Sequence, residues 1–311
     1  MAIINNRLAI PEAIVINGVN AAGAMQARIQ AGYDEVLRTP PDGLEVPLKD
    51  KAAQFVRGTI ISQDWVEAVG LLTGTVGTCV FFEGKSGTAH DRTDGTGFVK
   101  HTLTNPVIHR VRFSFTKGRY GTVTFDFECR PADETKGIAD MWGMTDSPAG
   151  AISYSTAARG GYRVESAVFD IDPDDINIYH VTGFEFGITM PLVKACNDGD
   201  VGYTCVDARL DGLRADGSLT FQDGAITTAK LLAQQLLIHA KDQLILTCRQ
   251  SQGATSKTVT LLGVDFETIS NNSDVNADFT EYTVNFEIAN DTTTQLTLAG
   301  TNKVIVIDDA A

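Results

Sequence analysis

Histidine and cysteine are the residue types in this sequence that could ligate a metal or attack a substrate, and their spacing favours neither role. The histidines have no partner at the spacing that zinc sites use: His90, His101, His109, His180 and His239. The cysteines include no Cys-x-x-Cys pair: Cys79, Cys129, Cys196, Cys205 and Cys248. Scattered thiols are typical of reduced, buried side chains in a protein made in the cytoplasm. We therefore predict no metal and no cofactor.

Paired carboxylates are the next candidates, because calcium prefers oxygen ligands. Asp172 and Asp174 form one pair, and Asp198 and Asp200 form another. The second pair lacks the later carboxylates of a full calcium loop, so we interpret both pairs as turns. The sequence contains no Gly-x-Ser-x-Gly elbow and no phosphate-binding P-loop. These patterns predict no catalytic constellation, and hence no enzyme.

The charge of the chain is acidic and unevenly distributed. Lys and Arg number 25 against 39 Asp and Glu, which leaves a net charge of −14. A chain this acidic repels phosphate backbones overall, so we do not expect a clamp that grips nucleic acid. Residues 10–130 hold 13 basic and 13 acidic side chains, whereas residues 176–290 hold 7 and 14. The two halves are therefore expected to present surfaces of different potential.

Alternating apolar and polar residues predict a protein built mainly of β-strands. Residues 107–115 and 122–128 alternate at period two on either side of a glycine-containing turn, which is typical of a hairpin. Similar alternation covers 258–266 and 279–288. Shorter strands are expected at 13–19, 55–62, 79–82, 181–189, 218–221 and 244–249. No apolar run approaches the roughly 20 residues of a membrane helix, and the N-terminus does not resemble a secretory signal.

Two short helices and a terminal strand complete the expected elements. Residues 227–237 place leucines at helical spacing after the N-cap residue Thr227, and 64–72 form a weaker counterpart after Asp64. Residues 303–307 are β-branched and would invite aggregation if unpaired. We expect them to add to a sheet edge, either of this chain or of a neighbour.

The order of these elements repeats along the chain. The strand that begins at Gly58 matches the one that begins at Gly217, and 124–128 matches 283–287, both at a separation of 159 residues. Upstream, residues 15–19 resemble 181–185. This pattern predicts a first β domain at 1–130, a connector at 131–175, a second β domain at 176–290 and a C-terminal strand or tail at 291–311. Two unrelated β domains, or one large sandwich, remain alternatives.

A compact β unit with one helix after an early strand, followed by a long hairpin, resembles the tail-tube fold of bacteriophage tails and related injection machines. The stretches that carry the resemblance are 55–72 with 107–129, and 217–237 with 257–289. The resemblance implies two tandem β-sandwich or barrel units, each with one short α-helix. The usual tube subunit has one such unit, and baseplate hub and tail-tip proteins that resemble this fold also carry duplicated units.

This resemblance implies a ring of six units that join their sheet edges around an inner barrel. Two units per chain would make the ring a homotrimer that looks pseudo-hexameric. Rings would stack through an extended loop between early strands, at 32–51 in the first copy and 197–212 in the second. The candidate stacking residues are Arg38, Thr39, Pro40, Asp42, Asp198, Asp200, Asp207 and Arg209.

The sequence therefore predicts a structural subunit of a virus tail tube, made in the host cytoplasm and located in the virion. Its partners would be further copies of itself and other tail or baseplate proteins, with no membrane. Genomic DNA would pass through the acidic channel without sequence-specific binding. The alternatives are a baseplate hub or tail-tip ring protein, a capsid-associated or adhesive β-sandwich module, and a hydrolase with acidic residues on strands.

Overall fold

The structure of the protein is a computed structural model in which the following residues are described: 11–16, 19–20, 24–38, 48–63, 65, 78–84, 98–133, 136–147, 161–170, 175–195, 207–222, 242–250, 256–272, 280–290, 295–298 and 302–309. Within these residues the protein is mainly β, as predicted, with antiparallel sheets and one four-residue helix, α2 (Ile138–Met141). No sheet closes on itself in the described part of the chain. The same residues contain no helix that could cross a membrane.

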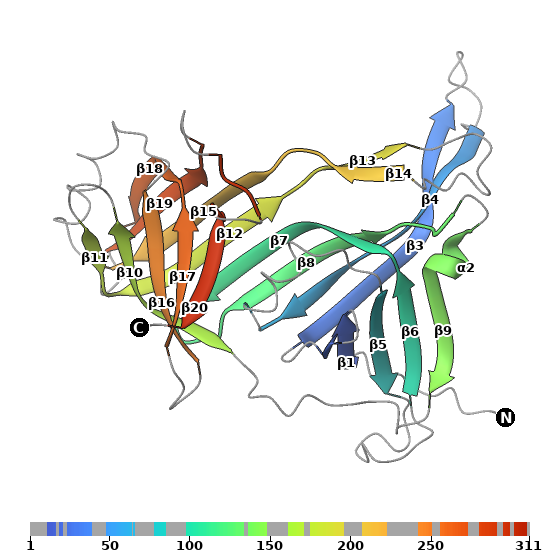
Figure 1. Ribbon diagram of the computed structural model, residues 1–311, viewed down its shortest axis with the longest axis horizontal. Coiled ribbons are helices and arrows are strands. Elements are labelled where there is room, and N and C mark those ends of the chain that lie inside the picture. Colours follow the sequence, from blue (N-terminus) through green and yellow to red (C-terminus); the bar gives the residue numbers. More distant parts are fainter. Residues whose placement is uncertain are drawn as a thin grey trace.

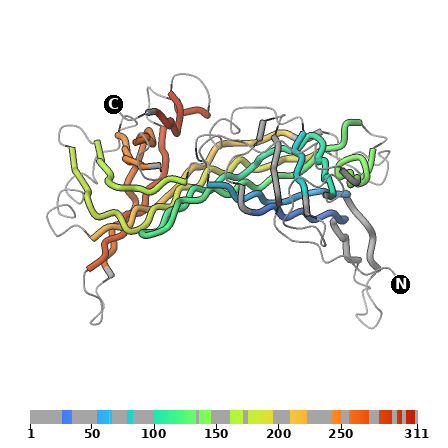
Figure 2. Tube along the Cα trace, turned by 90° about the horizontal axis from the view of Figure 1, so that it is seen from below, coloured from blue at the N-terminus to red at the C-terminus, as the bar shows by residue number. Residues whose placement is uncertain are grey.

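An eight-stranded sheet joins the two halves of the chain, and two five-stranded sheets accompany it (Figure 1). The eight-stranded sheet has the order β18 (Val264–Asn272), β19 (Glu281–Ile288), β15 (Arg214–Phe221), β12 (Val181–Thr189), β7 (Pro106–Thr116), β8 (Thr122–Cys129), β4 (Leu48–Ser62) and β3 (Ala24–Arg38). In the view of Figure 2 its long strands form one continuous, twisted band.

The five-stranded sheets lie at opposite ends of this band (Figure 1). The first has the order β2 (Val19–Asn20), β1 (Pro11–Ile16), β5 (Thr78–Gly84), β6 (Phe98–Thr104) and β9 (Trp142–Ser147). The second has the order β11 (Ile176–Ile178), β10 (Tyr162–Asp170), β16 (Gln243–Gln250), β17 (Ser256–Leu262) and β20 (Ile305–Asp309). A separate two-stranded hairpin consists of β13 (Leu192–Ala195) and β14 (Asp207–Leu210).

The strand order of the first half recurs in the second. The order β2-β1-β5-β6-β9 in the first half corresponds to β11-β10-β16-β17-β20 in the second. In the shared sheet, β3-β4-β8-β7 corresponds to β12-β15-β19-β18. Each half therefore contributes one five-stranded sheet and four strands of the shared sheet, in the same order. The repeat that the sequence pattern predicts is present in the topology of the described strands.

Residue register supports the same equivalence. Gly58 pairs with Phe127 between β4 and β8, and Gly217 pairs with Phe286 between β15 and β19, so both pairs are related by 159 residues. The two halves also share a β-bulge, at His109 in β7 and at Glu267 in β18. Since a bulge inserts one unpaired residue at a defined place, its recurrence fixes the alignment of the two halves residue by residue.

One apolar core runs through both halves. In β8 the buried residues Val123, Phe125, Phe127 and Cys129 alternate with partly exposed threonines and acids, which is the pattern of a strand with one covered face. Trp65 is fully buried, and its ring lies 5.7 Å from that of Phe113 in the first half and 6.1 Å from that of Phe184 in the second. The aromatic contacts across the boundary stabilise the two halves against each other.

Four expectations from the sequence need correction or qualification. Residues 258–266 form two strands in different sheets, because Gly263 adopts a left-handed φ of 77° between β17 and β18. Residues 15–19 and 181–185 are not equivalent, since β1 lies in a five-stranded sheet and β12 in the shared one. The connector predicted at 131–175 contains β9 and β10, each paired within a five-stranded sheet. Of the helices predicted at 64–72 and 227–237, only Trp65 lies within the described residues.

The C-terminal prediction is confirmed. Residues 305–309 form β20, which pairs antiparallel with β17 of the same chain, from Lys257 opposite Asp309 to Leu261 opposite Ile305. Ile305 is buried, so the β-branched segment covers apolar surface as well as completing the edge of its own sheet.

Candidate functional site

Three of the eight predicted stacking residues are described, and they lie on two hairpins. Arg38 is the last residue of β3 and pairs with Leu48 of β4. Asp207 and Arg209 belong to β14 and pair with Ala195 and Val193 of β13. Where they are described, the segments interpreted as loops, 32–51 and 197–212, contain strand residues that continue the antiparallel pairing. Five of the predicted residues lie outside the described part of the chain: Thr39, Pro40, Asp42, Asp198 and Asp200.

The junction between β7 and β12 is where the two halves meet within one sheet. Seven residue pairs join these strands, from Thr116 opposite Gly183 to Arg110 opposite Thr189. Backbone hydrogen bonds continue past the strand ends, since the Lys117 amide donates to the Thr182 carbonyl at 2.7 Å. The junction therefore has the hydrogen bonding of any interior strand pair, with no seam between the halves.

Apolar side chains cover one face of this junction. Phe113 and Phe186 stand directly opposite each other, both fully buried, with ring centroids 6.2 Å apart. Phe286 of β19 extends the row at 6.4 Å from Phe186. Opposed aromatic residues on neighbouring strands contribute to sheet stability beyond the area that they bury.

Two equivalent edges remain open in the described part of the chain. The strand β3 pairs only with β4, and β18 pairs only with β19. By the repeat, β3 is the counterpart of β12, and β18 is the counterpart of β7. At the junction β7 and β12 pair with each other, whereas their equivalents β18 and β3 each have one edge without a partner strand among the described residues. Open edges are templates for pairing with another chain.

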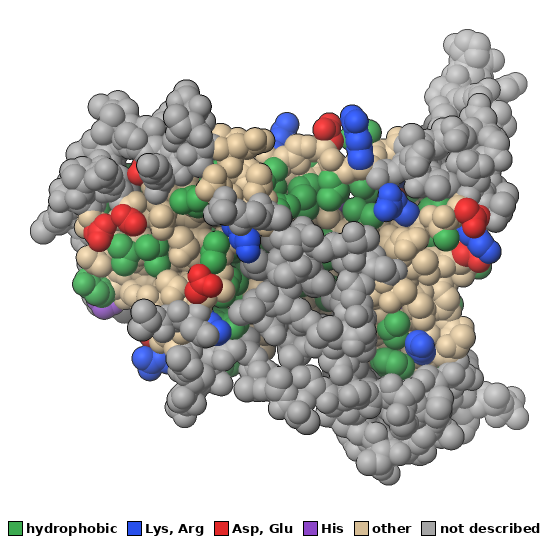
Figure 3. Space-filling model, in the orientation of Figure 1, with side chains coloured by type: hydrophobic (Ala, Val, Ile, Leu, Met, Phe, Trp, Pro, Cys, Tyr) green, Lys and Arg blue, Asp and Glu red, His purple; other side chains and the backbone are tan. Residues whose placement is uncertain are grey.

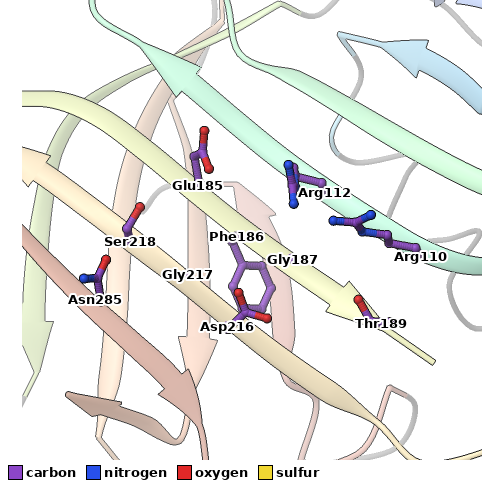
Figure 4. Close-up of a pocket in the computed structure, with 10 residues that line it drawn as sticks. All are labelled: Arg110, Arg112, Glu185, Phe186, Gly187, Thr189, Asp216, Gly217, Ser218 and Asn285. Carbon is purple, nitrogen blue, oxygen red and sulfur yellow. The ribbon is translucent and has the colours of Figure 1, made fainter. Parts of the chain in front are cut away.

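Charged side chains gather on the other face of the junction. Figure 4 shows Arg110 and Arg112 extending from β7 beside Glu185 of β12 and Asp216 of β15. These residues line a shallow hollow of about 190 Å³ together with Thr189, Ser218 and Asn285. In the view of Figure 3, by contrast, charged side chains of both signs are scattered over the surface that is coloured. Sequence patterns placed Arg110 and Arg112 at the polar positions of a strand but did not show which charges lie beside them.

Three of the cysteines and one of the histidines singled out for chemistry are buried in the core. Burial raises the pKa of the Cys79 and Cys248 thiols to about 12, and it also raises the pKa of Cys129. These thiols are therefore protonated at neutral pH and poor as nucleophiles or metal ligands. His101 accepts a hydrogen bond from the Trp142 indole at 3.1 Å and stacks on Phe81.

His109 and His180 are the other histidines in the described ranges, and His180 is exposed. His109 occupies the bulge of β7, where burial lowers its pKa against the opposing influence of Asp126 and Glu128. No group of three or more histidine, cysteine or acidic side chains in the described ranges is arranged to hold a metal ion. The carboxylates at 172, 174, 198 and 200 lie outside those ranges.

The comparisons with known proteins gave no match, either to a protein-family model or to a curated protein sequence.

Proposed function

We propose that this chain is a structural subunit of a virus tail tube that self-assembles into rings through the open edges of its eight-stranded sheet. The observation that carries the proposal is the junction of β7 with β12, where two units of the same topology continue one sheet in head-to-tail order. A surface that joins one unit to the next within a chain can join the last unit of one chain to the first unit of another.

The internal junction supplies the register expected between chains. With β18 in the place of β7 and β3 in the place of β12, Thr268 faces Gly32, and Ser270 faces Gln30. Ile269 and Ala31 then lie on the apolar face, where Val111 and Ile188 meet inside the chain. This pairing gives both open edges a partner strand, so neither edge is left to pair with unrelated chains in aggregates.

Ring closure follows from the number of strands. Three chains supply six units and 24 strands in the inner sheet. Strands spaced about 4.8 Å apart and tilted by about 40° close a barrel roughly 48 Å across between opposite backbones. Such a barrel leaves room for a DNA double helix between the side chains of its walls. Stacked rings of this kind would form a conduit for the viral genome.

Light scattering and electron microscopy test the assembly. We expect the purified chain to form particles of three times its mass, seen as rings with pseudo-sixfold symmetry that stack into tubes. Rings that never stack would indicate a baseplate hub or tail-tip protein, and a trimeric knob would indicate an adhesive or capsid-associated module. A monomer that persists at high concentration would contradict the proposal.

Disulfide cross-linking tests the register. In a background with Cys196→Ser and Cys205→Ser, the pair Ser270→Cys and Gln30→Cys is expected to give covalent oligomers on oxidation, because opposed Cα atoms lie within disulfide range. The matched control pairs Ser270→Cys with Arg28→Cys, which is displaced by two residues along the same face. Equal cross-linking by both pairs would contradict the register taken from the internal junction.

A further inference from the structure

The polar face of the eight-stranded sheet carries four arginines in the described part of the first half and mainly acids in the second, where Arg214 lies two residues from Asp216. The register aligns these four arginines of the first half with acidic or hydroxyl residues of the second. The equivalent pairs are Arg28 with Glu185, Arg57 with Asp216, Arg110 with Thr268, and Arg112 with Ser270. The two halves keep one backbone arrangement but present different charges on it.

The arginines of the first half lie close together across four strands. Arg110 of β7, Asp126 of β8, Thr59 of β4 and Arg28 of β3 are paired in one row. Arg57 stands two residues from Thr59 along β4, on the same face. The strip is therefore continuous from the junction with the second half to the open edge.

The acids beside these arginines already have partners. The Thr59 hydroxyl donates a hydrogen bond to the Asp126 carboxylate at 2.7 Å. Glu128 forms an ion pair with Lys194. Among the described residues, no ion pair joins a carboxylate to any of the four arginines. The four guanidinium groups therefore have N–H donors that a ligand can use, while Asp126 keeps its negative charge within their row.

The guanidinium groups border an open groove. Arg28, Arg57 and Arg110 line it together with Thr59, His109 and Asp126, and Arg112 lines the neighbouring hollow at the junction. The Arg57 guanidinium lies 4.0 Å over the ring of Phe55, which holds its plane while leaving its N–H groups at the rim. Planar guanidinium groups match the oxygens of a phosphate group in geometry as well as in charge.

The second half repels the same ligand. Asp265, Glu287 and Asp216 stand directly opposite one another on three neighbouring strands. Gly187 of β12 lies opposite Asp216 and continues this row. Glu185 lies two residues before Gly187, on the same face of the strand. Like charges at opposed positions disfavour the fold and concentrate negative potential on this face.

We propose that the first-half arginines Arg28, Arg57, Arg110 and Arg112 form a strip that contacts the phosphate backbone of double-stranded DNA, while the equivalent face of the second half repels it. The inference rests on the proposed function, since a ring of three chains would place three basic strips between three acidic ones around the channel. Attraction confined to narrow strips keeps contacts few, and a few phosphate contacts give weak, salt-sensitive binding.

The surroundings of the arginines favour a duplex over single strands. Single-stranded DNA is held by bases stacked on exposed aromatic rings. Phe55, the ring beside these arginines, is buried beneath Arg57 and offers no stacking platform. Contact is thus confined to phosphates, which a duplex presents in a regular array.

Fluorescence anisotropy of a labelled duplex of about 20 base pairs, titrated with the full chain at low salt, tests the strip. Binding is expected to weaken about tenfold in the Arg110→Gln/Arg112→Gln variant. The slope of log affinity against log salt should fall by about 2, because each lost phosphate contact accounts for about 0.9. The matched control is Arg163→Gln/Arg249→Gln, which removes the same charge from opposed positions on β10 and β16. It should bind as the unmodified chain does.

Several outcomes would overturn the inference. These are an unmodified chain that does not bind the duplex at low salt, equal weakening by the control variant, and equal or tighter binding of single-stranded DNA. Binding of polyglutamate as tight as that of the duplex would indicate an acidic protein partner instead. Ring formation, followed separately by light scattering, distinguishes the two proposals. Rings that show no strip-dependent DNA binding refute the strip alone, and strip-dependent binding by a chain that forms no ring refutes the tube.

Discussion

Glycines at equivalent positions of the two halves make a sharp test of the repeat. A methyl group added at Gly58 of β4 would lie 2.2 Å from the Arg28 carbonyl oxygen and 2.9 Å from the Phe127 ring. At Gly217 of β15 it would lie 2.5 Å from the Glu185 carbonyl oxygen and 2.6 Å from the Phe286 ring. Both sites thus lack room for a side chain, for the same reason.

The expected loss follows from these distances. An ordinary contact of a β-carbon is 3.4 Å or longer, so the neighbouring strand must withdraw by about 1 Å at either site. The obstacle is a backbone oxygen, which cannot rotate away as a side chain can. Overpacking of this kind costs about 1–3 kcal/mol. At about 2 °C per kcal/mol for a chain of this size, Gly58→Ala and Gly217→Ala should each lower Tm by about 2–6 °C.

Thermal unfolding followed by circular dichroism measures the effect. The control is Gly187→Ala on β12, where the nearest atom to an added methyl group is the Asp216 carbonyl oxygen at 3.9 Å. We expect its Tm to change by less than about 1 °C, as for a substitution that meets no obstacle. A Tm of Gly187→Ala that falls as far as the Tm of Gly217→Ala would refute the steric argument. A loss at only one of the two glycines would refute their equivalence.

Three further predictions concern the core and its titratable groups. Phe186→Ala removes a fully buried ring at the junction of the halves and should lower the free energy of unfolding by about 3–5 kcal/mol, measured in urea. Burial lowers the pKa of His109 below its ordinary 6.5, so the unfolded chain binds a proton first and stability falls as the pH drops below about 6.5. His109→Gln should reduce this loss of Tm, and an unchanged pH dependence would contradict it. Because burial raises the pKa of Cys79, Cys129 and Cys248, a thiol reagent should label them only after denaturation, in a variant whose other two cysteines are serine.

Patterns local to the chain predicted much of the fold. The alternation over 107–115 and 122–128 marks strands that the structure extends by only a residue or two, to Pro106–Thr116 and Thr122–Cys129. The separation of 159 residues matches Gly58 to Gly217 in the sequence, and the strand pairing of these two glycines agrees with that match. The sequence failed at 258–266, where alternation continues smoothly through a glycine that ends one strand and starts another in a different sheet.

By itself, the sequence determined which residues are strands, which face of each strand is apolar, and that the pattern occurs twice. These properties depend on side chains two residues apart, so short stretches of sequence are enough to predict them. Only the tertiary structure decided that β7 of one half pairs with β12 of the other, and that four arginines from three strands share one face. Strand partners are distant in the sequence, as for Tyr162 and Gln250 at 250 − 162 = 88 residues apart, and the choice among many apolar edges is made by the packing of the whole core.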